Sequence, residues 1–89
     1  MVRYSPDFLR KLKSANVRVR KSFKQRVLNF YRNPNELELN NHALRNEWAG
    51  YRSINITDDW RAIFTEKTEG KEKVAYFVAI GTHKELYKR

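Results

Sequence analysis

Residues 51–80 read YRSINITDDWRAIFTEKTEGKEKVAYFVAI, and the alternation within this stretch decides the fold. Side chains at its start repeat with a period of two, which places Ile54 and Ile56 on one face of a strand and Ser53 on the other. The stretch contains three predicted strands, at 51–56, 60–65 and 74–80. The third strand is strongly apolar, so we expect it to be central in the sheet.

Two short polar segments, 57–59 and 69–71, are typical of turns and separate the three strands. Because consecutive strands are then joined by hairpins, the sheet is predicted to be small and antiparallel. Residues 2–4 could add a short strand at its edge. One face of the sheet is expected to pack on helices, and the other could stay open.

Two helices are predicted before this sheet. A helix start is indicated by Ser5-Pro6-Asp7, because serine caps a helix, proline suits its first turn, and an acidic side chain favours its positive end. The helical pattern loosens near 14–16, resumes to about Arg32 and ends at Asn33-Pro34-Asn35. Apolar residues at helical spacing should face the core: Phe8, Leu9, Leu12, Phe23, Val27, Phe30 and Tyr31. The predicted fold class is α+β, with two N-terminal helices packed on a small antiparallel β-sheet in one domain, residues 1–89.

The net charge of +9 comes entirely from the first third of the chain. Residues 1–32 contain ten Lys or Arg and one acidic residue, Asp7, whereas residues 33–89 contain nine basic and nine acidic residues. A basic surface this concentrated attracts a polyanion such as RNA, or an acidic protein. A solvated helix face that keeps the protein soluble is the alternative. The RNA-binding candidates are Arg18, Arg20, Lys21, Lys24, Arg26 and Arg52.

Several classes of protein are excluded or disfavoured by what the sequence lacks. It has no cysteine, which excludes disulfides and thiolate metal sites. It has no run of about 18 apolar residues and no signal peptide, so no membrane association and a cytoplasmic location are expected. No cofactor is expected, because there is no glycine-rich phosphate loop. No metal is expected either, because His42, His83 and Asp59 lack the ligand spacing of a zinc site.

Five residues could together cleave RNA without a metal: His42, Asp59, Arg61, His83 and Tyr87. Such cleavage needs a base for the ribose 2′-hydroxyl, a cation for the phosphate and an acid for the leaving oxygen. His42 lies in a polar connection and His83 follows the third strand, and histidine exchanges protons near neutral pH. Arg61 offers a planar fork of donors to phosphate, although an ion pair with Asp58 or Asp59 is an alternative role.

Three stretches of the chain resemble the RelE/YafQ toxins. They are YSPDFLRKLK at 4–13, NHALRNEWAGYRSINITDDWRAIF at 41–64 and IGTHKELY at 80–87. Members of this superfamily pack two N-terminal helices on a small antiparallel sheet, which agrees with the fold predicted from the pattern. The resemblance implies the toxin of a type II toxin–antitoxin system, a ribosome-dependent endoribonuclease that cleaves mRNA by metal-independent acid–base catalysis.

The resemblance also assigns roles to individual positions. His42 matches the histidine of an N-H-x-L segment, and His83 matches the histidine of G-T-H. Asp59 and Trp60 match a D-W pair, and Tyr87 falls where an aromatic residue stands near the end. The implied mechanism makes His83 the general acid, whereas His42 or Asp59 would be the base or would orient the other partner.

Two positions depart from the YafQ-like pattern, which has a histidine at Asn55 and an arginine near Ala79. Arg61 matches an arginine that RelE-like members carry in the second strand, so it could supply the missing cation and hold the phosphate. Trp60 alternates with Arg61 and is therefore expected on the core side of its strand.

The implied partners are an acidic antitoxin, the ribosome and mRNA, with a toxin–antitoxin hetero-oligomer. Two other functions fit the same sequence less well. A ParE-type toxin on this fold inhibits DNA gyrase, but it would not need two histidines and an arginine. A plain RNA-binding module would show aromatics interleaved with basic residues on its binding face, whereas most aromatics here occupy expected core positions.

Overall fold

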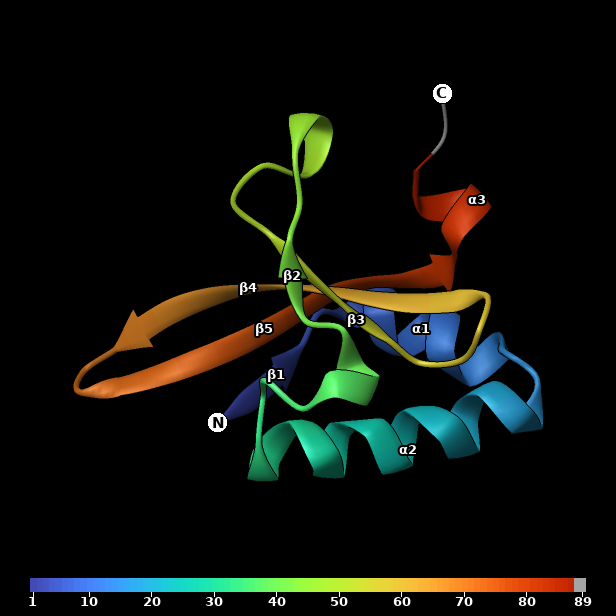
Figure 1. The fold of residues 1–89 in the computed structure, drawn as a ribbon, viewed down its shortest axis with the longest axis horizontal. Helices are drawn as coiled ribbons and strands as arrows, with labels where there is room; N and C mark the ends of the chain where they lie inside the picture. Colours follow the sequence, from blue (N-terminus) through green and yellow to red (C-terminus); the bar gives the residue numbers. More distant parts are fainter. Residues whose placement is uncertain (88–89) are drawn as a thin grey trace.

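In the computed structural model, which describes residues 1–87, a five-stranded sheet carries two helices on one face (Figure 1). The strands are β1 (Val2–Tyr4), β2 (His42–Ala43), β3 (Arg52–Asn55), β4 (Trp60–Glu69) and β5 (Glu72–Thr82). The helices are α1 (Pro6–Ser14), α2 (Val17–Arg32) and α3 (His83–Leu86), with two 3-10 turns, η1 (Leu37–Leu39) and η2 (Asn46–Trp48). The predicted α+β class, with two N-terminal helices on the sheet, is confirmed.

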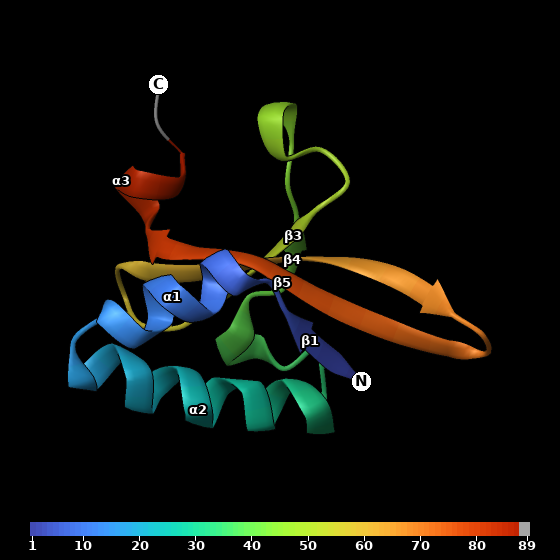
Figure 2. The same cartoon turned by 180° about the vertical axis from the view of Figure 1, so that it is seen from behind.

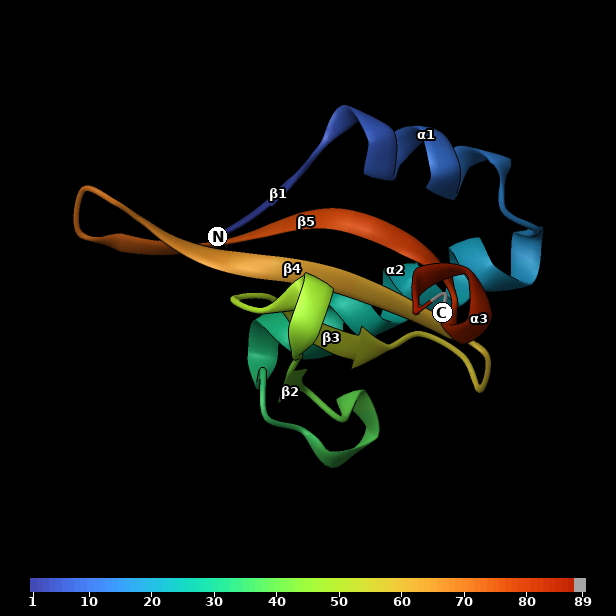
Figure 3. The ribbon, with the colours of Figure 1, turned by 90° about the horizontal axis from the view of Figure 1, so that it is seen from above.

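The sheet has the order β1-β5-β4-β3-β2 and is mixed rather than wholly antiparallel. The predicted hairpins are present, but the edge strand β1 runs parallel to β5. No hairpin joins these two strands, because all the other elements of the sheet and both N-terminal helices lie between them in the chain. Figure 3 shows β4 running between β5 and β3, so β4 occupies the middle that we expected for β5. Both strands extend beyond their predicted ends, and the two-residue β2 was not predicted.

The helix boundaries follow from side-chain caps at both starts. The Ser5 hydroxyl accepts a hydrogen bond from the Phe8 amide at 3.0 Å, and the Asn16 side chain accepts one from the Val19 amide at 3.0 Å. Helix α2 ends at Arg32, as predicted. These caps explain why the chain breaks into two helices between residues 14 and 17.

The predicted apolar stripes are right except at Leu9 and Tyr31, which are 49% and 57% exposed. Successive residues of a helix are rotated by about 100°. Leu9 is therefore turned away from the buried Phe8, and Tyr31 is turned away from the buried Phe30. Both side chains add apolar surface to the outside of the helical layer.

The core forms between the helices and the sheet around Phe77 of β5, which is fully buried. Five aromatic rings have centroids 5.0 to 6.2 Å from that of Phe77, and they belong to Tyr4, Phe8, Phe23, Phe30 and Phe64. These rings come from β1, both helices and β4, so they join all the layers. The expectation that Trp60 lies on the core side is also confirmed, because it is half-buried and packs against this cluster.

A β-bulge in β5 sets which side chains face the core. Ile63 of β4 lies opposite Ala79, but the next residue, Phe64, lies opposite Phe77, so Val78 is the extra residue. The bulge lets Phe77 and Ile80 both face the helices although they are an odd number of residues apart. Without the bulge, Ile80 would point away from the helices.

The segment from β2 to β3 and the helix α3 rise from the face of the sheet opposite α1 and α2, which we call the cleft face (Figure 2). This face is not open as expected. Ser53 and Ile63, which are paired across β3 and β4 and alternate with core residues, are both fully buried. Two structures thus project from a partly covered surface, and the candidate site lies between them.

Candidate active site

A cleft of about 460 Å³ lies between the segment 40–48 and helix α3, above strand β4. Its lining residues are Asn40, His42, Leu44, Arg45, Asn46, Glu47, Trp48, Arg61, His83 and Tyr87. The structure therefore brings together four of the five predicted catalytic residues, namely His42, Arg61, His83 and Tyr87. They come from β2, β4, the first residue of α3 and the residue after α3.

His42 is held with one ring nitrogen engaged and the other available. Its Nδ1 atom lies 2.8 Å from the main-chain oxygen of Asn40. A carbonyl oxygen only accepts hydrogen bonds, so Nδ1 must carry the hydrogen, and in the neutral ring Nε2 keeps its lone pair. Asn40 reaches this position in the left-handed region, at φ 46°, which asparagine tolerates better than most residues. The exposed His42 ring is thus arranged to accept a proton at Nε2.

The polar residue before His42 anchors the strand that carries it. The Asn41 side chain donates to the main-chain oxygen of Pro34 at 3.0 Å and accepts from Nε of Arg52 at 2.8 Å. The second of these contacts ties β2 to β3 beside the main-chain pairing of His42 with Ser53. Arg52, which we predicted to bind RNA, therefore supports β2, and it is half-buried.

Arg61 projects from β4 with one of its terminal nitrogens fixed. Nη1 donates to the main-chain oxygens of Thr57, Asp58 and Trp60 at 2.9, 3.0 and 3.0 Å. Within residues 1–87 it forms no ion pair with Asp58 or Asp59, and its Nε and Nη2 make no hydrogen bond. The turn between β3 and β4 therefore holds the guanidinium while two donor groups remain to bind an anion in the cleft.

The residue at which a histidine was expected lies next to this arginine. Asn55 of β3 is the cross-strand partner of Arg61, and its Oδ1 atom is buried without a hydrogen-bond partner among the described residues. Ala79, where an arginine was expected, pairs with Ile63 on the same face. Arg61 therefore places a guanidinium on the same face of the sheet as Ala79, the position at which the expected arginine is missing.

His83 and Tyr87 lie on one side of α3. Their ring centroids are 4.6 Å apart, and the Tyr87 amide donates to the His83 carbonyl at 3.0 Å. The helix begins with a capping box, in which the Thr82 hydroxyl accepts from the Glu85 amide and the Glu85 carboxylate accepts from the Thr82 amide. This reciprocal pair fixes the first turn, whose first residue is His83.

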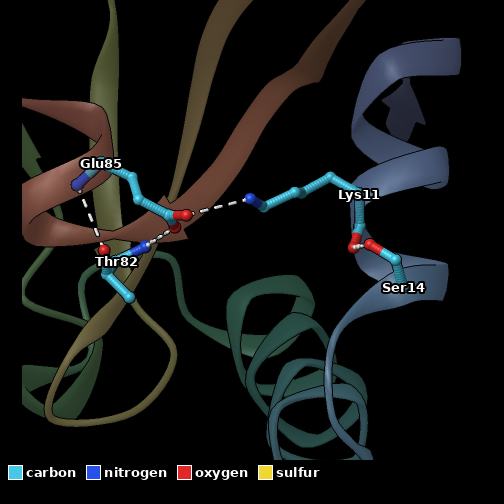
Figure 4. A network of polar contacts seen from close by, with 4 residues as sticks. All are labelled: Lys11, Ser14, Thr82 and Glu85. Atoms are coloured by element: carbon cyan, nitrogen blue, oxygen red, sulfur yellow. Dashed lines mark hydrogen bonds and ion pairs between the residues drawn. The ribbon is translucent and has the colours of Figure 1, made fainter.

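The same carboxylate connects α3 to the N-terminal helix (Figure 4). Glu85 Oε2 accepts from Lys11 Nζ at 3.2 Å, and the Lys11 ammonium also lies 5.9 Å from the centroid of the Trp60 ring. The hydrogen bond from the Thr82 backbone, followed by that from Lys11, lowers the pKa of the Glu85 carboxyl below its ordinary value. The carboxylate therefore stays ionised, and α3 stays anchored, well below neutral pH.

A close approach at Gly81 lets α3 fold back on the end of β5. A Cβ atom added there would lie 2.9 Å from Glu85 Oε1 and 3.5 Å from Leu86 Cδ2. The glycine of the G-T-H motif therefore leaves room for the capping carboxylate, which a side chain at this position would have to displace.

Trp48 ties the two walls of the cleft together, and our sequence-based prediction missed it. Its indole Nε1 donates to the main-chain oxygen of Leu86 at 3.0 Å, across 38 residues of sequence. Its ring packs edge-on against Tyr51, with centroids 5.5 Å apart. Three neighbours of Trp48 on the η2 wall, Arg45, Asn46 and Glu47, were also not predicted to line a site. All four residues lie within the stretch 41–64 that resembles the RelE/YafQ toxins.

Asp59 does not line the cleft. It lies in a second, polar depression of about 260 Å³ with Arg18 and Trp60, and its side chain is exposed. Its contribution to the cleft comes from the main chain, because its carbonyl oxygen accepts a hydrogen bond from the His83 amide at 2.9 Å.

The basic residues of α2 lie in the helical layer, on the other side of the sheet from the cleft (Figures 1 and 2). Arg20 donates to the main-chain oxygen of Ala15, and Arg26 forms an ion pair with Glu38 at 3.3 Å. Lys21 and Lys24 are exposed and form no ion pair within the described residues. The two lysines, like the exposed Arg18 and Arg32 of the same helix, are therefore available to contact a separate polyanion.

Residues 1–87 contain no group of three or more His, Cys, Asp or Glu placed to hold a metal ion. The part of the chain that the structure describes also has no helix long and apolar enough to cross a membrane.

Comparison with solved structures identifies the class of protein that has this fold. YafQ from Escherichia coli strain BL21(DE3) is 25% identical with a TM-score of 0.76, and the match covers 98% of this chain and 97% of that one. The YoeB/ParE toxin from Agrobacterium tumefaciens shares the fold at 18% identity, with a TM-score of 0.73 over 92% of this chain and 97% of that one. Escherichia coli YafQ in complex with DinJ also matches, at 25% identity and a TM-score of 0.61 over 98% of this chain and 97% of that one. The fold is therefore that of the small RelE-like toxins.

The sequence places the chain more narrowly within this class. A family model described as a bacterial toxin of a type II toxin–antitoxin system, YafQ, matches residues 1–88. The chain therefore belongs to the YafQ family of type II toxins. No curated protein matches it in sequence.

Proposed function

We propose that this toxin is a ribosome-dependent endoribonuclease that cleaves mRNA by metal-independent acid–base catalysis. The observation that carries the proposal is the convergence of two histidines and an arginine in one cleft, from three separate elements of the chain. They supply the proton acceptor, the proton donor and the phosphate ligand that the reaction requires.

In the first step, His42 acts as the base. Its Nε2 takes the proton from the 2′-hydroxyl of the nucleotide before the scissile bond, while its Nδ1 hydrogen remains bound to the Asn40 carbonyl. The 2′-oxygen then attacks phosphorus. Arg61 binds the non-bridging phosphate oxygens through Nε and Nη2 and stabilises the charge that grows on them.

In the second step, the bond from phosphorus to the 5′-oxygen breaks and His83 gives that oxygen a proton. The products are a 2′,3′-cyclic phosphate and a 5′-hydroxyl, so atoms and charge balance without water or metal. Tyr87 packs on the His83 ring and limits its rotation. Asp59 contributes through its carbonyl, which holds the first residue of α3 in place.

The helical layer is proposed to bind the toxin's macromolecular partners. Exposed Lys21 and Lys24 on α2 suit a ribosomal RNA backbone, which leaves the opposite face of the sheet for mRNA. Exposed apolar side chains lie in the same layer, including Leu28 at 49% and Tyr31 at 57% exposure. This combination of apolar and basic surface suits an acidic, amphipathic antitoxin segment, and the YafQ relative is solved in complex with DinJ.

The ends of the products test the proposal directly. Purified toxin is added to ribosomes programmed with a defined mRNA, and the fragments are mapped by primer extension and analysed for end groups. We expect cleavage on ribosomes but little on free mRNA, with 5′-hydroxyl ends, and we expect a single 2′-deoxy substitution at the scissile nucleotide to block it. Ends bearing a 5′-phosphate, or cleavage of the deoxy substrate, would contradict a 2′-hydroxyl attack.

Inhibition of DNA gyrase is the competing function of a ParE-type toxin. The likeness to the YoeB/ParE toxin, at 18% identity, extends only to the fold. A gyrase supercoiling assay with the same preparation is expected to show no inhibition. Inhibition by the wild-type toxin that persists in a His42→Ala, His83→Ala double variant would favour gyrase as the target.

A further inference from the structure

Glu47 is the one acidic side chain among the residues that line the cleft. The two arginines of the lining, Arg45 and Arg61, carry positive charge. Glu47 is exposed, and within the described part of the chain its carboxylate makes no hydrogen bond or ion pair. An acidic group in a cleft proposed to bind a polyanion works against phosphate binding, so it calls for a partner other than phosphate.

The backbone around Glu47 is fixed rather than free to let the carboxylate drift away. Glu47 is the middle residue of η2, whose turn is closed by hydrogen bonds from the Trp48 and Ala49 amides to the carbonyls of Arg45 and Asn46. Asn46 starts the turn in the left-handed region, at φ 57°. The Trp48 indole then ties the turn to α3. The backbone that carries the carboxylate is therefore held on the η2 wall of the same cleft that Arg61 lines.

We propose that Glu47 is a specificity-determining residue that selects a guanine base next to the scissile bond. This role rests on the proposed function, because it assigns to the η2 wall the recognition of one base of the mRNA substrate. Guanine presents two adjacent N–H donors, N1–H and N2–H, on its Watson–Crick edge, and a carboxylate has two oxygens to accept them. Adenine and cytosine each offer one exocyclic amino group on that edge, and uracil offers only N3–H.

Arg45, two residues earlier on the same wall, fits the same base. Arginine donates two parallel hydrogen bonds to O6 and N7 of guanine, and adenine presents an amino group in place of O6. Tyr87 and His83 offer aromatic rings on the facing wall, on which a splayed base can stack whatever its identity. Stacking would give affinity, while Glu47 and Arg45 would give the preference for guanine.

A role for Glu47 as the general base is the competing explanation, and the two roles predict different kinetics. His42 already has the hydrogen-bonding arrangement of a base. Loss of a base slows cleavage of every sequence and changes the acid limb of the pH–rate profile. Loss of a specificity residue changes the ranking of the four bases and leaves that profile unchanged.

The test uses ribosomes programmed with four mRNAs that differ in one nucleotide of the codon presented to the toxin. The kcat/KM is measured for wild-type protein, Glu47→Gln, Glu47→Asp and the matched charge-removal control Glu72→Gln, which lies at the far end of β5. We expect wild type and Glu72→Gln to prefer guanine about tenfold or more over the other bases. Glu47→Gln should lose most of that preference, and Glu47→Asp should retain part of it.

Binding provides a readout that does not depend on cleavage. Kd is measured for 2′-O-methyl trinucleotides that carry guanine, adenine, cytosine or uracil at the central position. A guanine preference in binding that Glu47→Gln removes supports the inference even if ribosome-bound mRNA is not cleaved, in which case the proposed function alone fails. No guanine preference in either assay, or an equal loss of cleavage on all four mRNAs with an altered pH profile, overturns the inference.

Discussion

The His83 amide donates a 2.9 Å hydrogen bond to the carbonyl of Asp59, so the start of α3 is fixed to the turn between β3 and β4. Nη1 of Arg61 is bound to carbonyls of the same turn. The proposed acid and the proposed phosphate ligand therefore share one rigid support. Catalytic groups that must act on neighbouring atoms of one substrate gain most from such a common frame.

Replacing His83 with alanine should abolish growth arrest and leave the fold intact. The side chain is exposed and makes no core contact, so its loss removes the proposed proton donor with little effect on packing. We expect a fall of roughly 10²–10⁴ in the rate of mRNA cleavage, with an unchanged circular dichroism spectrum. Lys84→Ala, at the next exposed position of α3, is the control. Wild-type cleavage by the His83 variant would remove this residue from the mechanism.

Gly81→Ala should reduce activity much more than stability. The added methyl would displace Glu85 Oε1 from its present position, which breaks the bond to the Thr82 amide and loosens α3. The free energy of unfolding should change by no more than about 1–2 kcal/mol, the usual value of a helix cap. Thermal melting combined with cleavage kinetics separates the two effects. Full activity in Gly81→Ala would show that the orientation of α3 does not limit cleavage.

The Thr82 amide should report the titration of Glu85. The folded-state pKa of this carboxyl lies below its ordinary value, so its contribution to stability is present above the unfolded-state pKa and is lost as pH falls through the folded-state pKa. In an NMR titration, the Thr82 amide signal should move upfield as pH falls and the carboxylate takes up a proton. The midpoint of this change should lie below the ordinary pKa of glutamate. The Thr82 shift should not titrate in Glu85→Gln. Lys11→Met should raise the midpoint, because it removes the hydrogen bond from Lys11 that helps to lower the pKa of Glu85.

Reversing the charge of Lys21 and Lys24 should weaken binding to ribosomes without impairing the cleft. Both side chains are exposed on α2, on the far side of the sheet from the candidate active site. The slope of log affinity against log salt concentration should become less steep by about 1–2, as phosphate contacts are lost. The control is the double variant Lys71→Glu, Lys73→Glu at the far end of the β4–β5 hairpin, which changes the net charge by the same amount. Equal sedimentation with ribosomes across the salt series would argue against this surface.

An acidic antitoxin should raise the melting temperature of the toxin and block its binding to ribosomes. A partner that binds only the folded state at 100 times its Kd adds about 2.7 kcal/mol to the free energy of unfolding. The toxin carries a net charge of +9, so association should be fast and should slow with added salt. Differential scanning calorimetry and ribosome sedimentation of the complex measure both effects. Cleavage by the complex at the rate of the free toxin would show that the antitoxin acts elsewhere.

Local patterns in the sequence determined the class of fold and the residue types of the site. Alternation predicts β3 and β4, a strongly apolar run predicts β5, and the cap Ser5 indicates where α1 begins. These signals can be read from sequence because each depends on residues within a few positions of one another. The concentration of positive charge in residues 1–32 is equally independent of the fold.

Tertiary structure alone decided which of those residues meet. The parallel pairing of β1 with β5 and the bond from Trp48 to Leu86 join segments far apart in the chain. The bulge at Val78 appears only once β5 is paired with β4. It is this long-range packing that brings His42 and His83 into one cleft and leaves the Asp59 carboxylate outside it. No local pattern encodes such a choice, because the free energy that selects it comes from burying surfaces that exist only after the elements have formed.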